Sequence, residues 1–184
     1  MRVIIVGNSP DLLKATNGHL IDSFDFVVRM NHYEIDGYQK YLGTKTDIYA
    51  TAWATPKKKP FDKFEYVIHY TGPDNIEGYT PQANEILFTK EEYQQMQDAM
   101  LFSHYDTQPS LGAAVIFYFL KYYPNFEIYI TGFDYFGFKN KDYTFGHYYE
   151  EKRYPRLRAY MHHEPDKEME YVDNLIANNK IKEL

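Results

Sequence analysis

The chain has 184 residues and a mass of 21.9 kDa, a length typical of one domain with a substantial core. It carries 20 lysines and arginines against 26 aspartates and glutamates, and this net charge of -6 argues against nucleic acid as the main partner. Because the chain has no cysteine, it has no disulfide, thiolate metal site or cysteine nucleophile. A mean hydropathy of -0.60, without an apolar run of about 18 residues, predicts a soluble protein.

Six short apolar runs predict strands that are buried on both faces of a parallel sheet. They are residues 2–6, 25–28, 47–50, 65–70, 85–88 and 127–131. The first run starts directly after Met1, so no secretory signal is expected before it.

Three further stretches predict helices. Thr89 and Glu92 have the spacing of a capping box, which opens a helix to about residue 101. An apolar stretch over residues 110–123 predicts a second helix, and residues 164–178 have the apolar spacing of a third.

The alternation of strands and helices predicts one α/β domain over residues 1–184, Rossmann-like, with a mainly parallel central sheet flanked by helices. In such a fold, ligands bind at the carboxyl ends of the strands. Residues 31–46 form a polar loop in this prediction, without an element of their own. Residues 132–163 are long, aromatic and basic, and we expect them to form a lid loop.

Polar residues follow the first two predicted strands. Gly7, Asn8 and Ser9 come after the first, and Asn31 comes after the second. The glycine patterns of dinucleotide and P-loop sites are absent, which disfavours those two kinds of site. The two asparagine amides side by side would make a small polar floor for a nucleotide. For Asn8, a turn or helix-cap role is the alternative.

The second predicted helix opens with Ser110, Leu111 and Gly112. Small residues permit close approach to the backbone, and a helix amino terminus attracts phosphate. An ordinary cap with small residues for packing is the alternative interpretation.

Three histidines have positions that suit chemistry. His163 precedes the last helix and Glu168 follows within its first turns, so the carboxylate could fold back toward the ring. The helix dipole disfavours the imidazolium form and would leave His163 a neutral base, although a surface capping role is the alternative. His147 lies in the expected lid, and His104 is a weaker candidate.

Several catalytic patterns are missing. The Asp-x-Asp and His-Glu-x-x-His spacings of metal sites do not occur, so no metal-dependent mechanism is expected. The Gly-x-Ser-x-Gly pattern of α/β-hydrolase esterases is absent too.

Taken together, the motifs resemble those of the animal-type sialyltransferase family. The large motif is matched by residues 4–9, 21–31 and 43–46, and the small motif by residues 109–112 through 131–133. Residues 147–150 match the third motif, and His163 with Glu168 matches the very small motif. Four motifs in the correct order cover nearly the whole chain, which is far more specific than any one of them.

This resemblance implies an inverting, metal-independent transfer of sialic acid from CMP-sialic acid to a sugar hydroxyl. It also implies a Rossmann-like fold of the glycosyltransferase A type. CMP-sialic acid is then the donor substrate and a glycan or glycolipid is the acceptor, with no cofactor required.

The resemblance also assigns roles to individual residues. His163 would be the base that deprotonates the acceptor hydroxyl, supported by Glu168, and His147 would donate to the departing phosphate. Asn8 and Asn31 would hold the phosphate and ribose of CMP. The residues expected to contact the donor are Gly7, Asn8, Ser9, Asn31, Ser110, Leu111, Gly112, Gly132 and Tyr148.

The chain departs from the animal pattern in three ways. It has no cysteine for the disulfide that joins the large and small motifs, and we expect neither the amino-terminal membrane helix nor the stem of the animal members. Leu111 replaces the usual threonine. We therefore expect a minimal, soluble member of bacterial or viral origin, located in the cytoplasm. Basic residues in the ranges 57–59 and 152–158 would bring it to the inner face of a membrane, or form solvated loops.

Other functions remain open at this point. Another CMP-activated keto sugar, such as Kdo, could be the donor. A separate bacterial sialyltransferase family shares the Gly-Asn turn and a late histidine. A non-catalytic CMP-sugar-binding protein or lectin is opposed by the presence of both His147 and His163, and a generic NAD binder by the missing glycine pattern.

Overall fold

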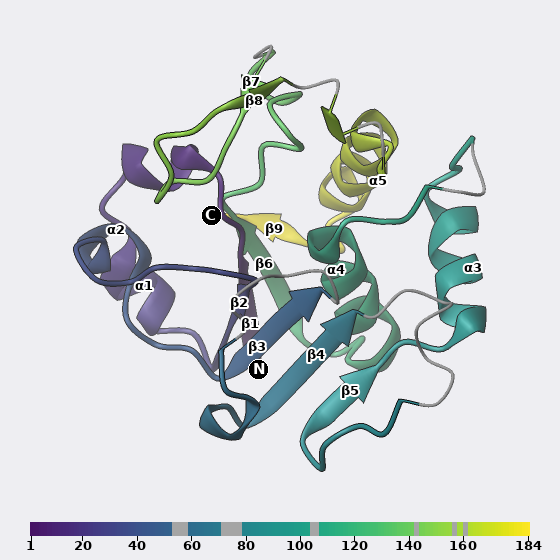
Figure 1. Cartoon of the computed structure of the whole chain (residues 1–184), viewed down its shortest axis with the longest axis horizontal. Coiled ribbons are helices and arrows are strands. Elements are labelled where there is room, and N and C mark those ends of the chain that lie inside the picture. The colour runs from purple at the N-terminus through teal and green to yellow at the C-terminus, as the bar shows by residue number, and fades with distance from the viewer. Residues whose placement is uncertain (53–58, 71–78, 104–106, 142–143, 156–157, 160–161) are drawn as a thin grey trace.

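The computed structural model describes residues 1–52, 59–70, 79–103, 107–141, 144–155, 158–159 and 162–184. A seven-stranded sheet lies at its centre, with all strands parallel in the order β5-β4-β3-β2-β1-β6-β9 (Figure 1). The strands are β1 (Arg2–Val6), β2 (Phe26–Met30), β3 (Ile48–Ala52), β4 (Tyr66–Tyr70), β5 (Glu85–Leu87), β6 (Glu127–Thr131) and β9 (Lys182–Glu183). The six strands expected from the apolar runs are confirmed.

The central strands are apolar on both faces because both faces are covered. Successive side chains of a strand point to opposite sides of the sheet. In β1, Val3 and Ile5 pack into the larger of the apolar clusters, whereas Ile4 and Val6 pack into a second one. None of the four is more than 2% exposed, which explains the continuous apolar run.

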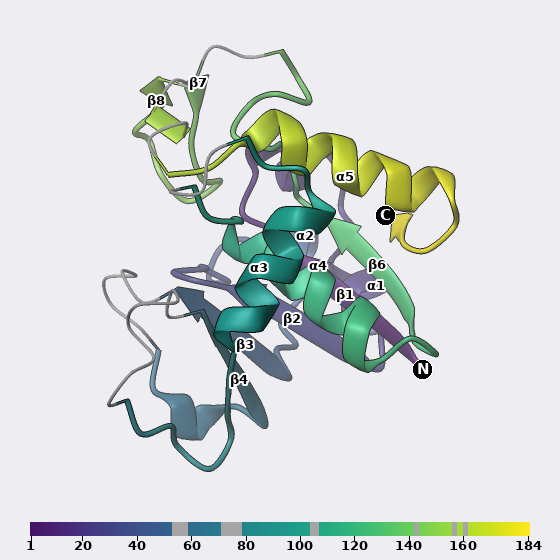
Figure 2. The same ribbon diagram turned by 90° about the vertical axis from the view of Figure 1, so that its right-hand side faces the viewer.

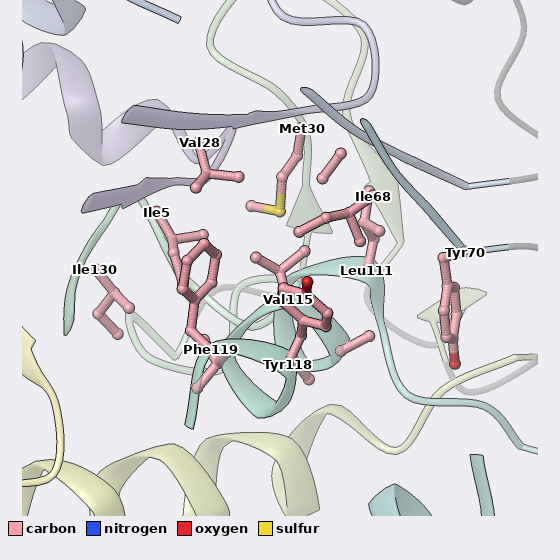
Figure 3. Close-up of a cluster of buried hydrophobic side chains, with 14 of the residues drawn as sticks. Ile5, Val28, Met30, Ile68, Tyr70, Leu111, Val115, Tyr118, Phe119 and Ile130 are labelled. Carbon is pink, nitrogen blue, oxygen red and sulfur yellow. The ribbon is translucent and has the colours of Figure 1, made fainter. Parts of the chain in front are cut away.

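Helices of very different length cover the two faces. The face with Val3 and Ile5 packs against α3 (Lys90–Ala99), α4 (Leu111–Tyr122) and α5 (Pro165–Ala177) (Figures 1 and 2). Figure 3 shows this cluster, in which side chains of α4 meet those of the central strands. The opposite face packs against two short helices, α1 (Gly18–Asp22) and α2 (Gln39–Leu42). In the part of the chain that the structure describes, no helix has the length and apolar character needed to cross a membrane.

All three predicted helices begin as their sequences indicated, and α5 has Glu164 as its N-cap residue and Pro165 in its first turn. The Thr89 side chain accepts a hydrogen bond from the Glu92 N–H, and the Glu92 carboxylate accepts one from the Thr89 N–H. The capping box of α3 is therefore confirmed. Ser110 caps α4, since its Oγ accepts a hydrogen bond from the Ala113 N–H at 3.3 Å.

The prediction of a loop without elements over residues 31–46 is wrong, because α2 lies within it. This helix is too short to be stable alone. It is fixed by contacts with the sheet: Leu42 is fully buried, and the Leu42 carbonyl accepts a hydrogen bond from Arg29 Nη2 at 2.6 Å. The following backbone is held by Asp22, whose carboxylate accepts a hydrogen bond from the Thr44 N–H at 2.8 Å.

Two further differences lie in the second half of the chain. The expected lid segment contains a small antiparallel pair, β7 (Thr144–Phe145) and β8 (Tyr154–Pro155). The strand β9 follows the last helix and pairs with β6, although its two charged residues have no apolar pattern. Both pairings come from tertiary contacts that a local pattern does not carry.

Candidate active site

The strand order changes direction between β1 and β6, which is where a doubly wound fold opens a crevice. The segment that follows β1 lies directly against the end of β6 and the residue after it. The Gly7 N–H donates to the Thr131 carbonyl at 2.8 Å, and the Ser9 N–H donates to the Gly132 carbonyl at 3.0 Å. A Cβ on Gly7 would lie 2.2 Å from the Gly132 oxygen, so only glycine permits this approach.

Gly132→Ala is expected to destabilise the protein far more than Gly37→Ala. Both glycines have positive φ, of 72° and 84°, so each alanine costs about 1 to 2 kcal/mol for its backbone. At Gly132 the new Cβ would also lie 2.7 Å from the Leu12 side chain, whereas nothing lies within 4 Å at Gly37. The overpacking adds about 1 to 3 kcal/mol. Urea unfolding of both variants measures the difference, and equal losses would contradict the crowding.

A pocket of about 550 Å³ opens at this crevice. It extends along the carboxyl ends of β1, β2, β3 and β4 to the first residues of α4 and α5, with the segment after β6 as a further wall. The structure brings together in its lining the predicted residues Gly7, Asn8, Ser9, Asn31, Ser110, Leu111, Gly112, Gly132, His147, His163 and Glu168. Tyr148 is not among the lining residues.

The two asparagines at the strand ends hold neighbouring strands together. Asn8 Nδ2 donates to the Met30 carbonyl at 3.0 Å, which links the ends of β1 and β2. Asn31 Oδ1 accepts from the Ala52 N–H at 3.0 Å, which links β2 to β3. A primary amide has two N–H groups and one carbonyl oxygen, so the Asn8 amide carries polar atoms beyond this one bond. These contacts fix both amides at the floor of the pocket.

Glu168 takes its hydrogen bonds from Ser110 and not from the expected partner His163. The Ser110 N–H donates to Oε1 at 2.8 Å and the Ser110 Oγ donates to Oε2 at 2.5 Å. The carboxylate is buried, and burial raises its pKa to about 7 even though both bonds from Ser110 lower it. Leu111 and Gly112 then occupy the first turn of α4, whose N–H groups lie outside the bonding of the helix itself.

His163 is held in the tautomer that suits a base. Its Nδ1 lies 2.7 Å from the Gln108 carbonyl, which can only accept, so Nδ1 carries the hydrogen and Nε2 keeps its lone pair in the neutral ring. Phe136 stacks on the ring at 5.3 Å and 19°. Burial is the main cause that lowers the pKa of His163 below its ordinary 6.5, and His162 adds to it. The neutral form expected from the sequence thus has burial as its leading cause.

His147 is oriented by its own neighbours in the chain. Its Nδ1 lies 2.8 Å from the Glu150 carboxylate, and its ring stacks on Tyr149 at 5.2 Å and 10°. Tyr148 between them points elsewhere: its hydroxyl donates to the Glu34 carbonyl at 2.5 Å, and its N–H donates to the Asn8 carbonyl at 3.0 Å. Tyr148 therefore fastens the segment that carries His147 to the loops after β1 and β2.

Comparison with known proteins agrees with these motifs. Residues 1–77 match the model of glycosyltransferase family 29 (sialyltransferase). A mouse CMP-N-acetylneuraminate-beta-galactosamide-alpha-2,3-sialyltransferase 2 is 25% identical over 201 residues, which cover 98% of this chain. The crystal structure of a mammalian sialyltransferase matches the whole chain with a TM-score of 0.75 at 21% identity, over 68% of that structure. The chain is thus similar in sequence to the sialyltransferases.

The match to the family 29 model confirms the resemblance read from the four motifs, and the structural match confirms the Rossmann-like α/β fold. A second structure, of a mammalian sialyltransferase in complex with Gal-beta-1-3GalNAc-ortho-nitrophenol, matches with a TM-score of 0.72 at 22% identity. It too is covered over 68% of its length by the whole of this chain. The chain spans 56% of the length of the mouse relative that it matches.

The pocket also contains residues that the motifs did not indicate. Asp134 follows β6, and its carboxylate accepts hydrogen bonds from the Ser9 side chain and from the N–H groups of Phe136 and Gly137. Burial raises the pKa of Asp134. Tyr70 ends β4 and lines the pocket as well. The rule that ligands bind at the carboxyl ends of parallel strands could have found both.

Other sequence candidates lie away from the pocket or outside the described residues. His104, Lys57, Lys58 and Arg156 fall outside the residues that the structure describes. Lys152 and Arg158 each lie over the ring of Tyr154, at 5.1 and 4.6 Å from its centroid. Among the described residues, no group of three or more histidine, aspartate or glutamate side chains is placed to hold a metal ion.

Proposed function

We propose that this chain catalyses the inverting, metal-independent transfer of sialic acid from CMP-sialic acid to a hydroxyl of an acceptor glycan. The observation that carries the proposal is the joint position of His147 and His163 in one pocket, each with Nδ1 engaged by an acceptor oxygen. In both rings Nε2 is then the nitrogen that can form a hydrogen bond with a substrate or exchange a proton with it. The match of residues 1–77 to the sialyltransferase model, and the likeness to the mouse sialyltransferase, support this choice of donor.

In the proposed mechanism, His163 Nε2 takes the proton from the acceptor hydroxyl. The acceptor oxygen forms a bond to the anomeric carbon of sialic acid, and the bond from that carbon to the phosphate oxygen of CMP breaks. The electron pair stays with the phosphate. To donate a hydrogen bond to it from Nε2 while Nδ1 donates to Glu150, His147 acts as an imidazolium, with a hydrogen on both ring nitrogens. Attack opposite the leaving group inverts the anomeric centre, and the oxocarbenium-like transition state is stabilised where its charge develops.

The donor would be bound by backbone and amide groups at the floor of the pocket. Asn8 and Asn31, which line the pocket, would hold the phosphate and ribose, and the first turn of α4 would offer N–H groups to an anion. Because CMP-sialic acid leaves a single phosphate, its departure requires less neutralisation than that of a diphosphate, and the proposal needs no divalent metal. The cytoplasmic location and membrane contact expected from the sequence stay predictions.

A thermal shift experiment with excess EDTA tests the donor class. CMP and a non-hydrolysable CMP-sialic acid analogue should each raise the melting temperature, because a ligand at 100 times its Kd adds about 2.7 kcal/mol to the folded state. UDP, GDP and NAD should leave it unchanged. A response to NAD or to the diphosphates alone would contradict the proposal, and a CMP response lost in EDTA would contradict metal independence.

A turnover assay then tests the reaction itself. Release of CMP from CMP-sialic acid is followed with and without Gal-beta-1-3GalNAc-ortho-nitrophenol, the compound bound in the crystal of the mammalian relative. Release that depends on this acceptor supports transfer to a galactose-containing glycan. Binding of CMP without release on any acceptor would favour a non-catalytic CMP-sugar-binding protein, and release from CMP-Kdo alone would favour the other keto sugar.

A further inference from the structure

Tyr70 is placed at a wall of the pocket that the proposed mechanism does not use. It is the last residue of β4, so it lies at the carboxyl edge of the sheet, three strands away from Gly7 at the end of β1. Its ring packs against Phe88 at 5.5 Å and against Tyr93 at 4.9 Å. Figure 3 shows it at one end of the apolar cluster. The side chain is 5% exposed and lines the same pocket as His163.

The hydroxyl of Tyr70 lacks a hydrogen-bond partner. Among the residues that the structure describes, it is the one buried side-chain nitrogen or oxygen atom in this condition. Polar groups at the starts of α4 and α5, by contrast, are paired: Thr107 Oγ1 donates to Glu164 at 2.9 Å, and Ser110 donates to Glu168. A buried hydroxyl without a partner is unfavourable, and such groups in folded proteins call for an explanation.

The surroundings of Tyr70 keep this hydroxyl neutral. Burial raises the pKa of Tyr70 well above 10, and the negative charges of Tyr93 and Glu168 would act in the same direction. A neutral phenol has an O–H group that can donate a hydrogen bond. In a site shielded from water, a bond from such a donor to a ligand oxygen is stronger than the same bond in solvent.

We propose that Tyr70 is a donor-binding residue, whose hydroxyl donates a hydrogen bond to an oxygen of the bound sugar nucleotide at the β4 end of the pocket. This rests on the proposed function, since it takes the CMP-activated sugar as the ligand. Tyr70 extends the site beyond the amides of Asn8 and Asn31, which lie at the ends of β1 and β2, to the fourth strand from the crevice.

The substitution Tyr70→Phe separates this role from a structural one. A hydroxyl with a partner inside the protein stabilises the fold, so its removal lowers the melting temperature. Removal of an unpartnered buried hydroxyl leaves the melting temperature of the free protein unchanged or raises it. The Kd of the ligand should instead rise about tenfold, the loss expected for one well-placed hydrogen bond.

Titration calorimetry of the wild type and Tyr70→Phe, with CMP and with the non-hydrolysable CMP-sialic acid analogue, is the experiment. Tyr66→Phe is the matched control, because Tyr66 lies at the other end of the same strand, is 44% exposed and is not among the lining residues of this pocket. It should change neither Kd. Weaker binding of both ligands by Tyr70→Phe places the accepting oxygen on the nucleotide, and weaker binding of the analogue alone places it on the sugar.

Unchanged Kd values for both ligands in Tyr70→Phe would overturn the proposal and indicate that a buried water satisfies the hydroxyl. A lower melting temperature of the free variant than of Tyr66→Phe would overturn it too, because it would reveal a partner within the protein. If the wild type itself binds neither ligand, it is the proposed function that fails, and the two failures are thereby distinguished.

Discussion

His163→Ala is expected to lower kcat for transfer from CMP-sialic acid by about 10²- to 10⁴-fold, while the affinity for CMP stays close to that of the wild type. The Gln108 carbonyl fixes the hydrogen on Nδ1, so Nε2 is the nitrogen that can accept the proton of the acceptor hydroxyl. Alanine removes this base but leaves Asn8 and the first turn of α4 in place. CMP release in the presence of acceptor measures kcat, and calorimetry with CMP measures the affinity.

His162→Ala is the matched control for this prediction. His162 is the preceding residue in the chain and lines the same pocket, but its side chain is exposed. The two rings lie 6.5 Å apart, so the control removes an imidazole from the same wall. If His162→Ala loses as much turnover as His163→Ala, or if His163→Ala keeps most of its turnover, the assignment of the base to His163 is wrong.

The central part of the fold could be predicted from the sequence because burial on both faces leaves a local trace. The runs around Ile5 and Ile130 are apolar without interruption, and both residues lie in the core. β9 leaves no such trace. Lys182 and Glu183 are exposed, and the strand is held by backbone pairing with β6 and by an ion pair of Lys182 with Glu127 at 2.9 Å. Lys182 and Glu127 are 55 residues apart in the chain, and a contact between residues so far apart leaves no local pattern in the sequence.

The same distinction applies to the candidate site. The motifs located His147, His163 and the residues that follow β1 and β2 in the pocket, because each motif is a short run with fixed spacing. They did not locate the partner of Glu168, since Ser110 lies 58 residues away and the five-residue spacing to His163 was the only nearby signal. Tyr70 is one of 20 tyrosines, and only its lack of a hydrogen-bond partner in the structure distinguishes it.

Glu168 should make the stability of the protein fall as the pH rises from about 4.5 to about 7. Burial raises its pKa from the ordinary 4.5 to about 7, so in this window the folded protein binds a proton that the unfolded chain has lost. The unfolding free energy therefore decreases with increasing pH across the window and becomes level above it. The shift corresponds to a loss on the order of 3 kcal/mol.

Glu168→Gln should remove this dependence, because the amide has the shape of the protonated carboxyl and does not titrate. We expect the variant to gain stability relative to the wild type between pH 5 and pH 8, by up to about 3 kcal/mol. Urea unfolding of both proteins at the two pH values measures the gain. The quantity compared is the effect of Glu168→Gln on the unfolding free energy at pH 8 minus its effect at pH 5. Any cost of replacing the bonds from Ser110 is present at both pH values and cancels in this subtraction.

Glu92→Gln is the control with the opposite expectation. Glu92 is buried too, but the Thr89 N–H, Tyr122 and Lys121 together lower its pKa below 4.5 against the effect of burial. The stability that Glu92 contributes is lost only below pH 4.5, so Glu92→Gln should cost the same at pH 5 and pH 8. If Glu168→Gln changes the unfolding free energy equally at pH 5 and pH 8, the Glu168 carboxylate of the wild type is ionised throughout this window. The bonds from Ser110 would then outweigh the burial of Glu168.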